Sequence, residues 1–193
     1  MVDPQNVDWA DIKEKLPYRK NDVDKDKRTA LWKGIDINGN GVVSLAEMDK
    51  GLRDAIQLEV LFDSPKVLMR AFQKSKNAVG SNKTYGDDYI ERKELRYILK
   101  YLRRYFEYWV AYARLSADND VLNLDEFVAN IGEVEKWNVE FDDPEALFKQ
   151  IDKNGKGKIL FDEWVEWADS IKLDIDDDDD NVSADEDEPP KEE

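Results

Sequence analysis

DINGNGVVSLAE, residues 36–47, alternates oxygen-bearing side chains with other residues, has a glycine at its middle and ends in a glutamate. Ca²⁺ takes about six to eight oxygen ligands in an irregular shell, and alternate residues of a curled loop can all point toward one ion. Gly41, at position 6, permits the sharp reversal that such a loop needs. The stretch therefore predicts a calcium-binding loop rather than an Asn- and Gly-rich surface turn. The candidate ligands, at positions 1, 3, 5, 7, 9 and 12, are Asp36, Asn38, Asn40, Val42, Ser44 and Glu47.

Each candidate ligand has an expected role, and each flank of the loop has an expected helix. Val42 would bind through its backbone carbonyl, Ser44 directly or through a water, and Glu47 through both carboxylate oxygens. The other three would each give one side-chain oxygen. Apolar residues recur at helical spacing in residues 24–35 and 45–56. A helix on each side is the context that a calcium loop of this kind requires.

A shorter pattern occurs four times along the chain: an apolar residue, three others, a glutamate and a second apolar residue. We expect the first apolar residues to meet in short antiparallel bridges, one between Val43 and Ile90 and one between Leu122 and Ile159. We expect the second apolar residue of each copy to begin the next helix and to face the core. The glutamates are Glu47, Glu94, Glu126 and Glu163, and the residues that follow them are Met48, Leu95, Phe127 and Trp164.

The fourth copy, DKNGKGKILFDE at residues 152–163, keeps the spacing of the first loop, with Gly157 at position 6. Lysine at position 5 removes an expected side-chain oxygen, so Lys156 could contribute only through its backbone or a water, and Lys158 through its backbone carbonyl. Two cationic side chains weaken cation binding, so the sequence leaves calcium occupancy of this loop open. The candidate ligands are Asp152, Asn154, Lys156, Lys158 and Glu163.

The two middle copies have lost most of their ligands. The loop that ends at Glu126 has Leu115 at position 1 and Ala117 at position 3, where oxygens are expected. The loop that ends at Glu94 has Lys83 at position 1. We predict that neither loop binds calcium, because the number and charge of the ligands set the affinity.

Paired helix–loop–helix motifs cover each other's apolar faces, so we predict an all-α fold of four EF-hand motifs in two lobes, with a short antiparallel β bridge between the loops of each pair. The N-lobe would span residues 23–100 and the C-lobe residues 101–173. Residues 91–115 have a nearly continuous helical pattern, so a long or slightly bent helix would join the lobes. Residues 1–22 would be an extension whose short amphipathic helix packs on the protein itself. Residues 174–193, with twelve acidic residues and one lysine, would be a disordered tail.

Composition narrows the possible functions. None of the 193 residues is Cys or His, which removes disulfides, thiol nucleophiles and the commonest general base, so we expect no enzyme. A net charge of −16 argues against nucleic acid or anionic lipid as the main partner, because both are themselves negative. The chain has no apolar stretch long enough to span a membrane, and its N-terminus lacks the apolar core of a signal peptide. We therefore expect an intracellular, cytoplasmic protein, and a monomer.

Four segments resemble the calflagins, the flagellar calcium-binding proteins of kinetoplastid protists: KRTALWKGIDINGNG (27–41), RAFQKSKNAVGS (70–81), DPEALFKQIDKNGKGK (143–158) and FDEWVEWADSIKLDIDDDDDNVS (161–183). The resemblance implies four EF-hands, some of them degenerate, in a calcium sensor at the flagellar membrane. It implies ligand roles for the candidates of the first and fourth loops, apart from Ser44 and Lys156. Calflagins are anchored by myristate on an N-terminal glycine and palmitate on a nearby cysteine. This chain begins MVDP and has no cysteine, so no lipid anchor is evident.

The leading hypothesis is a non-enzymatic calcium sensor in a flagellum or cilium. Calcium would pull Glu47 or Glu163 inward, turn the helix that follows and expose apolar surface to a protein partner. The alternative is a calcium buffer or a constitutive flagellar scaffold that changes shape little. A calcium-triggered photoprotein is a third hypothesis, disfavoured because the chain has no histidine to act on a bound substrate. We expect Ca²⁺ as the bound ion, with Mg²⁺ as a competitor.

Overall fold

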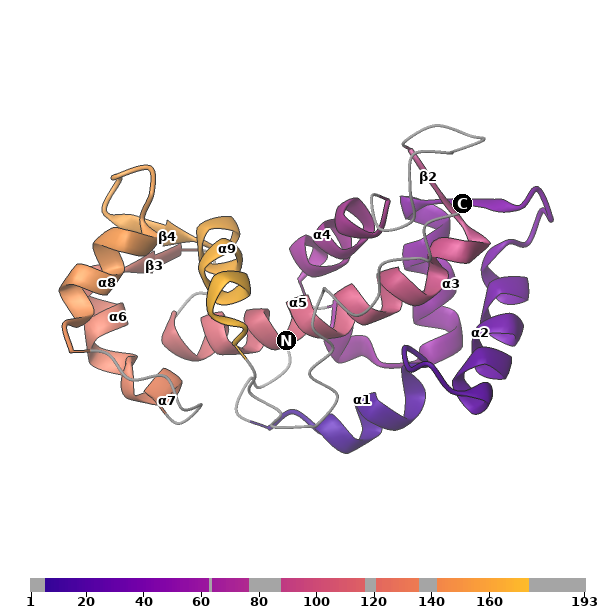
Figure 1. Cartoon of the computed structure of the whole chain (residues 1–193), viewed down its shortest axis with the longest axis horizontal. Helices are drawn as coiled ribbons and strands as arrows, with labels where there is room; N and C mark the ends of the chain where they lie inside the picture. The colour runs from indigo at the N-terminus through magenta and orange to yellow at the C-terminus, as the bar shows by residue number, and fades with distance from the viewer. Residues whose placement is uncertain (1–5, 63, 77–87, 117–120, 136–141, 174–193) are drawn as a thin grey trace, which may run out of the picture. The chain divides into compact units, whose positions relative to one another are not determined.

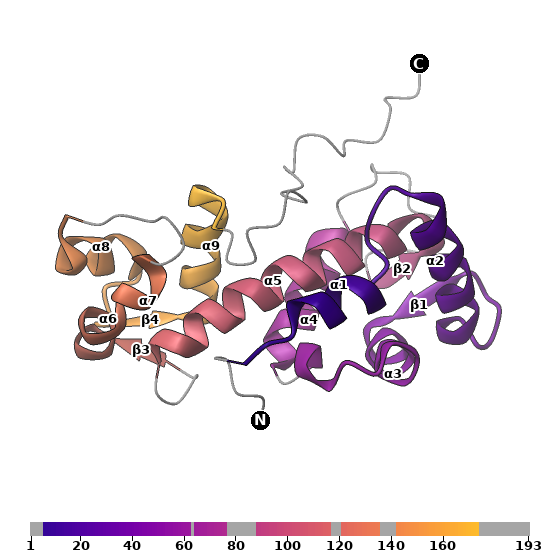
Figure 2. The ribbon, with the colours of Figure 1, turned by 90° about the horizontal axis from the view of Figure 1, so that it is seen from below.

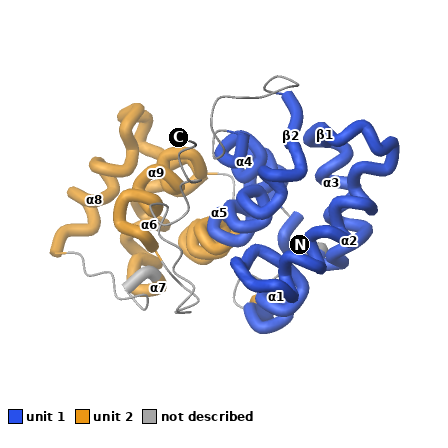
Figure 3. The backbone as a smooth tube through the Cα atoms, turned by 45° about the vertical axis from the view of Figure 1, so that its right-hand side comes forward, with its two compact units in different colours: residues 1, 8–105, 182–193 blue, residues 2–7, 106–181 orange. Residues whose placement is uncertain are grey.

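The computed structural model describes residues 6–62, 64–76, 88–116, 121–135 and 142–173 (Figure 1). Within these ranges the chain is mostly helical and contains two short, two-stranded antiparallel sheets. It divides into two compact units, one of residues 8–105 and one that contains residues 106–173 (Figure 3). The boundary falls inside one helix, α5 (Leu95–Leu115), which is continuous as its sequence pattern predicts. The acidic tail, residues 174–193, lies outside the described residues.

The first unit contains α1 and two helix–loop–helix motifs. Asn21 begins the first motif as a helix cap, because its side-chain oxygen accepts a hydrogen bond from the backbone N–H of Asp24 at 2.7 Å. Pro65 occupies the first turn of α4, where its missing N–H costs nothing. The elements are α1 (Trp9–Lys15), α2 (Asp22–Ile35), β1 (Val42–Ser44), α3 (Leu45–Ile56), the 3-10 turn η1 (Glu59–Phe62), α4 (Pro65–Ser75), β2 (Tyr89–Glu91), the 3-10 turn η2 (Arg92–Glu94) and the first half of α5.

The second unit repeats the arrangement with the second half of α5 as its first helix. Asp143 caps α8 by accepting from the backbone N–H of Ala146 at 3.0 Å, and Pro144 is the first helical residue. The remaining elements are β3 (Val121–Asn123), α6 (Leu124–Asn130), α7 (Gly132–Glu135), α8 (Pro144–Ile151), β4 (Lys158–Leu160) and α9 (Phe161–Ile171). Together the two units confirm the predicted EF-hand architecture.

The strands join the first loop to the second and the third loop to the fourth, each pair in a two-stranded sheet (Figure 2). β1 pairs with β2 so that Val43 lies opposite Ile90, and β3 pairs with β4 so that Leu122 lies opposite Ile159. Both predicted bridges are therefore confirmed in register. All four of these side chains are fully buried, so each ladder also contributes to the core of its unit.

The residue after each closing glutamate lies in the core, as the repeat predicts. The prediction that it begins the next helix is wrong except at Leu95, because α3, α6 and α9 begin three residues earlier, with the glutamate already in their first turn. Met48, Phe127 and Trp164 have no exposed surface, and Leu95 is 2% exposed. In the second unit the core is aromatic: the rings of Phe127 and Phe148 meet edge to face, with centroids 5.6 Å apart. The buried Trp164 indole donates to the backbone carbonyl of Tyr108 at 2.9 Å, which satisfies its one polar group.

α2 and α3 approach closely at a glycine. A Cβ atom added to Gly51 would lie 2.7 Å from Cγ1 and 3.0 Å from Cα of Ile35, which is closer than van der Waals contact permits. Only glycine allows the backbone of α3 to approach Ile35 this closely. The contact lies next to the first loop, because Ile35 directly precedes Asp36.

The N-terminal helix α1 packs on its own protein, as predicted. Ile12 and Leu16 on its apolar face are 1% and 0% exposed, and Trp9 is half-buried. The guanidinium of Arg103 in α5 lies over the ring of Tyr18, 5.3 Å from its centroid. Among the described residues, no helix combines the length and the apolar character that crossing a bilayer requires.

Candidate metal centres

The first loop, residues 36–47, is closed by hydrogen bonds from its candidate ligands. The Asp36 carboxylate accepts from the backbone N–H groups of Asn40 and Gly41, both at 3.1 Å. The Asn38 side-chain oxygen accepts from Asn40 N–H at 2.9 Å, and the Asn40 side-chain oxygen accepts from Val42 N–H at 3.0 Å. The side-chain oxygens at positions 1, 3 and 5 therefore bind backbone N–H groups of their own loop. Gly41 has φ +81°, a conformation in which other residues are strained.

Glu47 connects the end of this loop to the start of α3. Its Oε2 accepts from the Ser44 backbone N–H at 2.9 Å and from the Ser44 hydroxyl at 2.8 Å. Its Oε1 accepts from the Asn38 side-chain amide at 3.2 Å, so positions 3 and 12 are already in contact. The backbone hydrogen bond from Ser44, and then its hydroxyl, hold the pKa of Glu47 below the usual glutamate value. The carboxylate is therefore negatively charged at neutral pH, as a calcium ligand must be.

The fourth loop, residues 152–163, repeats this geometry. The Asp152 carboxylate accepts from the backbone N–H groups of Lys156 at 3.2 Å and Gly157 at 2.8 Å. Glu163 accepts from the Leu160 backbone N–H at 3.0 Å through Oε2, and from both the backbone and side-chain amides of Asn154 through Oε1. The two carboxylate groups thus occupy equivalent positions in both loops.

The fourth loop differs from the first in two respects. Its carboxylates are the more buried pair: Asp152 is 8% exposed and Glu163 9%, whereas Asp36 and Glu47 are both half-buried. The side chains of Lys156 and Lys158 are exposed, which leaves the loop interior free of ammonium groups. Positions 5 and 9, where the first loop has Asn40 and Ser44, nevertheless offer no side-chain oxygen, because Lys156 and Leu160 occupy them. This loop therefore has two side-chain ligands fewer.

The two middle loops keep the glutamate and its helix cap. Glu94 accepts from the Glu91 backbone N–H at 2.8 Å and is fully buried. Glu126 accepts from the Asn123 backbone N–H at 3.1 Å. Leu115, at position 1 of the third loop, ends α5 and has no exposed surface, so it belongs to the core. Ala117 and Lys83 lie outside the described residues.

The oxygens gathered in the first and fourth loops fit Ca²⁺ better than a softer metal. Carboxylate, amide and peptide oxygens are the ligands that hard cations prefer. Within the described part of the chain, no three carboxylate, imidazole or thiolate side chains converge on one point. Each loop instead pairs two carboxylates with amide and peptide oxygens, which is enough charge to balance a divalent ion.

The helix caps made by the closing glutamates were missed in the sequence analysis. All four glutamates hydrogen-bond to the backbone N–H three residues earlier. In the first and third motifs the partner is also a capping residue, Ser44 or Asn123, whose side chain accepts from the N–H of the glutamate. A Ser or Asn followed three residues later by Glu is a known signal for the start of a helix, and it could have identified these caps.

This chain is similar in sequence to proteins of one family. A family model described as the FCaBP EF-hand domain matches residues 12–102. The chain is 35% identical to the flagellar calcium-binding protein of Trypanosoma cruzi over 181 residues, which cover 90% of this chain and 84% of that protein. It is 32% identical to the flagellar calcium-binding protein TB-24 of Trypanosoma brucei brucei over 174 residues, or 89% and 80% of the two chains. Among solved structures, a homolog of programmed cell death 6 protein from Leishmania major Friedlin superposes with a TM-score of 0.40 at 17% identity, over 82% of this chain and 79% of that chain.

Proposed function

This chain belongs to the family of flagellar calcium-binding proteins, and on that basis we propose that it binds Ca²⁺ in the loops 36–47 and 152–163 and acts as a calcium sensor in a flagellum or cilium. The ligands of the first loop would be the six residues named from its spacing. The fourth loop would use Asp152, Asn154, the Lys158 carbonyl and Glu163, with a water or the backbone at Lys156 completing the shell.

The observation that carries the proposal is the shared geometry of the two loops. In each, the carboxylate at position 1 binds the N–H groups at positions 5 and 6, and the glutamate at position 12 contacts the asparagine at position 3. Both ends of the ligand set are therefore brought together before any ion binds, which lowers the cost of ordering the loop.

The closing glutamate would couple the ion to the fold. Glu47 now uses both oxygens for hydrogen bonds, to Ser44 at the start of α3 and to Asn38 in the loop. A bidentate bond to Ca²⁺ would replace part of this bonding and pull the first turn of α3 toward the ion. Because α3 packs on α2, a rotation of the whole helix α3 would change which apolar side chains are covered. This could create a surface for a protein partner.

A calcium buffer or constitutive scaffold is the second candidate, and the contact at Gly51 favours it. The backbone of α3 lies directly against Ile35, so α3 has little freedom to slide along α2. A protein restrained in this way would bind the ion and change shape little. Mg²⁺ would compete at the same oxygens in either role, although its octahedral shell suits an irregular loop less well.

Calorimetric titration with Ca²⁺ tests the two sites. We compare the parent chain with Glu47→Gln and Glu163→Gln, because glutamine can keep the helix cap while it removes the negative charge. We expect Glu47→Gln to weaken one site by roughly a hundredfold, since it loses a charged bidentate ligand. A titration curve for Glu47→Gln that matches the parent curve would refute the assignment of the first loop.

Binding of a fluorescent apolar dye, with and without Ca²⁺, separates a sensor from a buffer. A sensor exposes apolar surface when it binds calcium, so dye fluorescence should rise in the parent chain. The same rise should be absent in Glu47→Gln at a calcium concentration that fills only the first loop. A parent chain that binds calcium with no change in dye fluorescence would be a buffer.

A further inference from the structure

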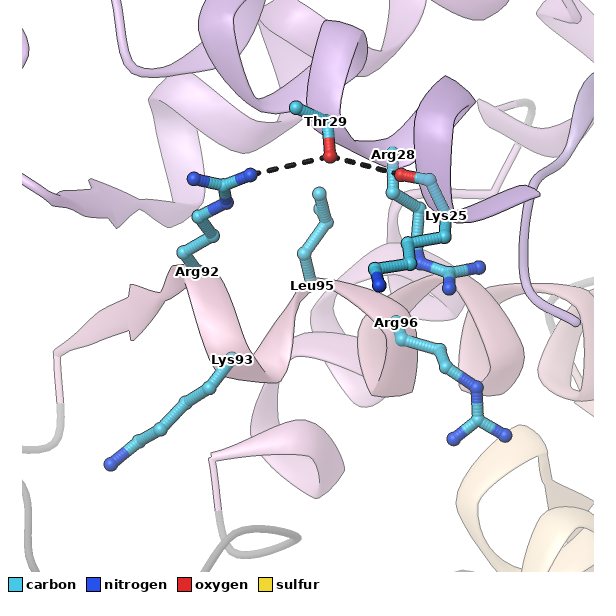
Figure 4. Close-up of a pocket in the computed structure, with 7 residues that line it drawn as sticks. All are labelled: Lys25, Arg28, Thr29, Arg92, Lys93, Leu95 and Arg96. Atoms are coloured by element: carbon cyan, nitrogen blue, oxygen red, sulfur yellow. Dashed lines mark hydrogen bonds between the residues drawn. The ribbon is translucent and has the colours of Figure 1, made fainter. Parts of the chain in front are cut away.

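A pocket in the first unit is lined almost entirely by basic side chains (Figure 4). Its volume is about 390 Å³. The chain as a whole has a net charge of −16, yet none of the described residues that line this pocket is acidic. The lining residues are Lys25, Arg28, Thr29, Arg92, Lys93, Leu95 and Arg96.

Two distant parts of the chain build the pocket. One wall is α2, and the other is formed by η2 and the first turn of α5. The β1–β2 ladder brings these walls together, because it pairs Val42, just after the first loop, with Glu91, just before η2. The basic side chains are therefore gathered by the fold and do not form a run in the sequence.

Hydrogen bonds hold two of the arginines in place. Arg28 donates through Nη1 to the backbone carbonyls of Pro17 at 2.9 Å and Arg19 at 2.8 Å. Arg92 donates through Nη2 to the Thr29 hydroxyl at 3.2 Å (Figure 4). Fixed guanidinium groups lose less conformational entropy when they bind an anion than free ones do.

Two arginines of the pocket, Arg28 and Arg96, repel each other. Burial lowers the pKa of Arg28, repulsion from Arg96 lowers it further, and attraction to Asp24 opposes both effects. At the rim, Lys93 pairs with Glu91 at 3.1 Å. An anion between α2 and α5 would relieve the repulsion between Arg28 and Arg96.

We propose that this pocket binds a compact polyanion that carries phosphate monoesters. Arginine guanidinium groups match phosphate oxygens in bidentate geometry, and lysine ammonium groups add point charge. The small, partly enclosed volume favours several phosphates on one small scaffold over an extended polymer. The ligand is either a free phosphorylated molecule or the phosphorylated headgroup of a lipid, and both present the same chemistry to the pocket.

Binding of inositol 1,4,5-trisphosphate to the full chain, measured by calorimetry, tests the proposal. The buffer contains a calcium chelator, so the result does not depend on whether the loops bind Ca²⁺. A second arm measures co-sedimentation with phosphatidylcholine vesicles that contain phosphatidylinositol 4,5-bisphosphate. Both arms compare the parent chain with the double variant Lys25→Gln/Arg92→Gln and with a control, Lys50→Gln/Lys66→Gln. The control removes the same charge from exposed positions of the first unit outside the pocket.

We expect the parent and control chains to bind alike and the pocket variant to bind at least about tenfold more weakly, because two charge-assisted contacts are lost. If this difference appears with free inositol trisphosphate but not with vesicles, the ligand is a free phosphorylated molecule, and if it appears with both probes the pocket accepts either source. If it appears only with vesicles, the ligand is the lipid headgroup. The proposal is overturned if the parent chain binds neither probe, or if the control variant loses as much affinity as the pocket variant.

Discussion

The first and third helix–loop–helix motifs end in the same way and begin differently. In both, the closing glutamate accepts from the backbone N–H three residues earlier, Ser44 in one motif and Asn123 in the other. At position 1, however, the first motif has a carboxylate that gathers the loop, whereas the third has the buried Leu115. The glutamate thus has a structural role, starting the exit helix, that is independent of any metal. Its retention in a loop does not by itself indicate a calcium site.

The fourth loop gives the most direct way to sharpen this comparison, because it keeps the spacing of the first loop and lacks its side-chain oxygens only at positions 5 and 9. Lys156→Asn would restore at position 5 the residue type that the first loop has at Asn40. We expect calcium affinity of the fourth loop to rise by about tenfold, since the variant adds an oxygen and removes a positive charge. Calorimetric titration in a Glu47→Gln background isolates that loop. The matched control, Lys149→Asn, removes the same charge from α8; equal gains in the two variants would show that the effect is only one of net charge.

Removing Glu126 should separate the helix cap from metal binding. We expect Glu126→Ala to lower the free energy of unfolding by about 1 kcal/mol, the usual cost of a lost cap, and to leave the calcium titration unchanged. Urea denaturation and calorimetry measure the two quantities. Glu126→Gln is the control, because glutamine can still accept the hydrogen bond from Asn123. A change in calcium binding in either variant would contradict the assignment of the third loop as a non-binding one.

The smallest expected effect concerns the pKa of Glu47. The Ser44 hydroxyl is the second cause of its lowered pKa, so Ser44→Ala should move that pKa part of the way back toward the usual glutamate value. A carboxyl group with a lowered folded-state pKa stabilises the protein above its unfolded pKa, and this contribution is lost as pH falls through the folded value. The variant should therefore lose that contribution, and its calcium affinity, at a higher pH than the parent. Carboxyl-carbon NMR titration without calcium measures the pKa, and Ser64→Ala, at a helix start with no side-chain cap, should leave it unchanged.

Local spacing in the sequence was enough to predict the loops and their pairing. The register of Val43 with Ile90 follows from the fixed distance between position 8 and the closing glutamate, and the burial of Trp164 follows from its place after Glu163. The basic pocket could not be predicted in this way. Lys25 and Arg92 are far apart in the sequence and become neighbours only because the β1–β2 ladder joins their motifs. The contact of Gly51 with Ile35 likewise depends on how two helices cross, which a helical pattern does not determine.

The contact at Gly51 restrains sliding of α3 along α2, so the motion it still permits is a small tilt of α3 about Gly51. Gly51 is four residues beyond Glu47, or about 6 Å along the helix axis, and Ile56 is about 7.5 Å further on. If α3 tilts about Gly51 when an ion draws Glu47 inward, Ile56 moves in the opposite direction. Its displacement is then similar in size to that of Glu47. In the fourth motif the residue that corresponds to Gly51 is Trp167, and its bulky indole prevents so close an approach of the two helices. If both loops bind calcium as proposed, their exit helices would therefore move by different amounts.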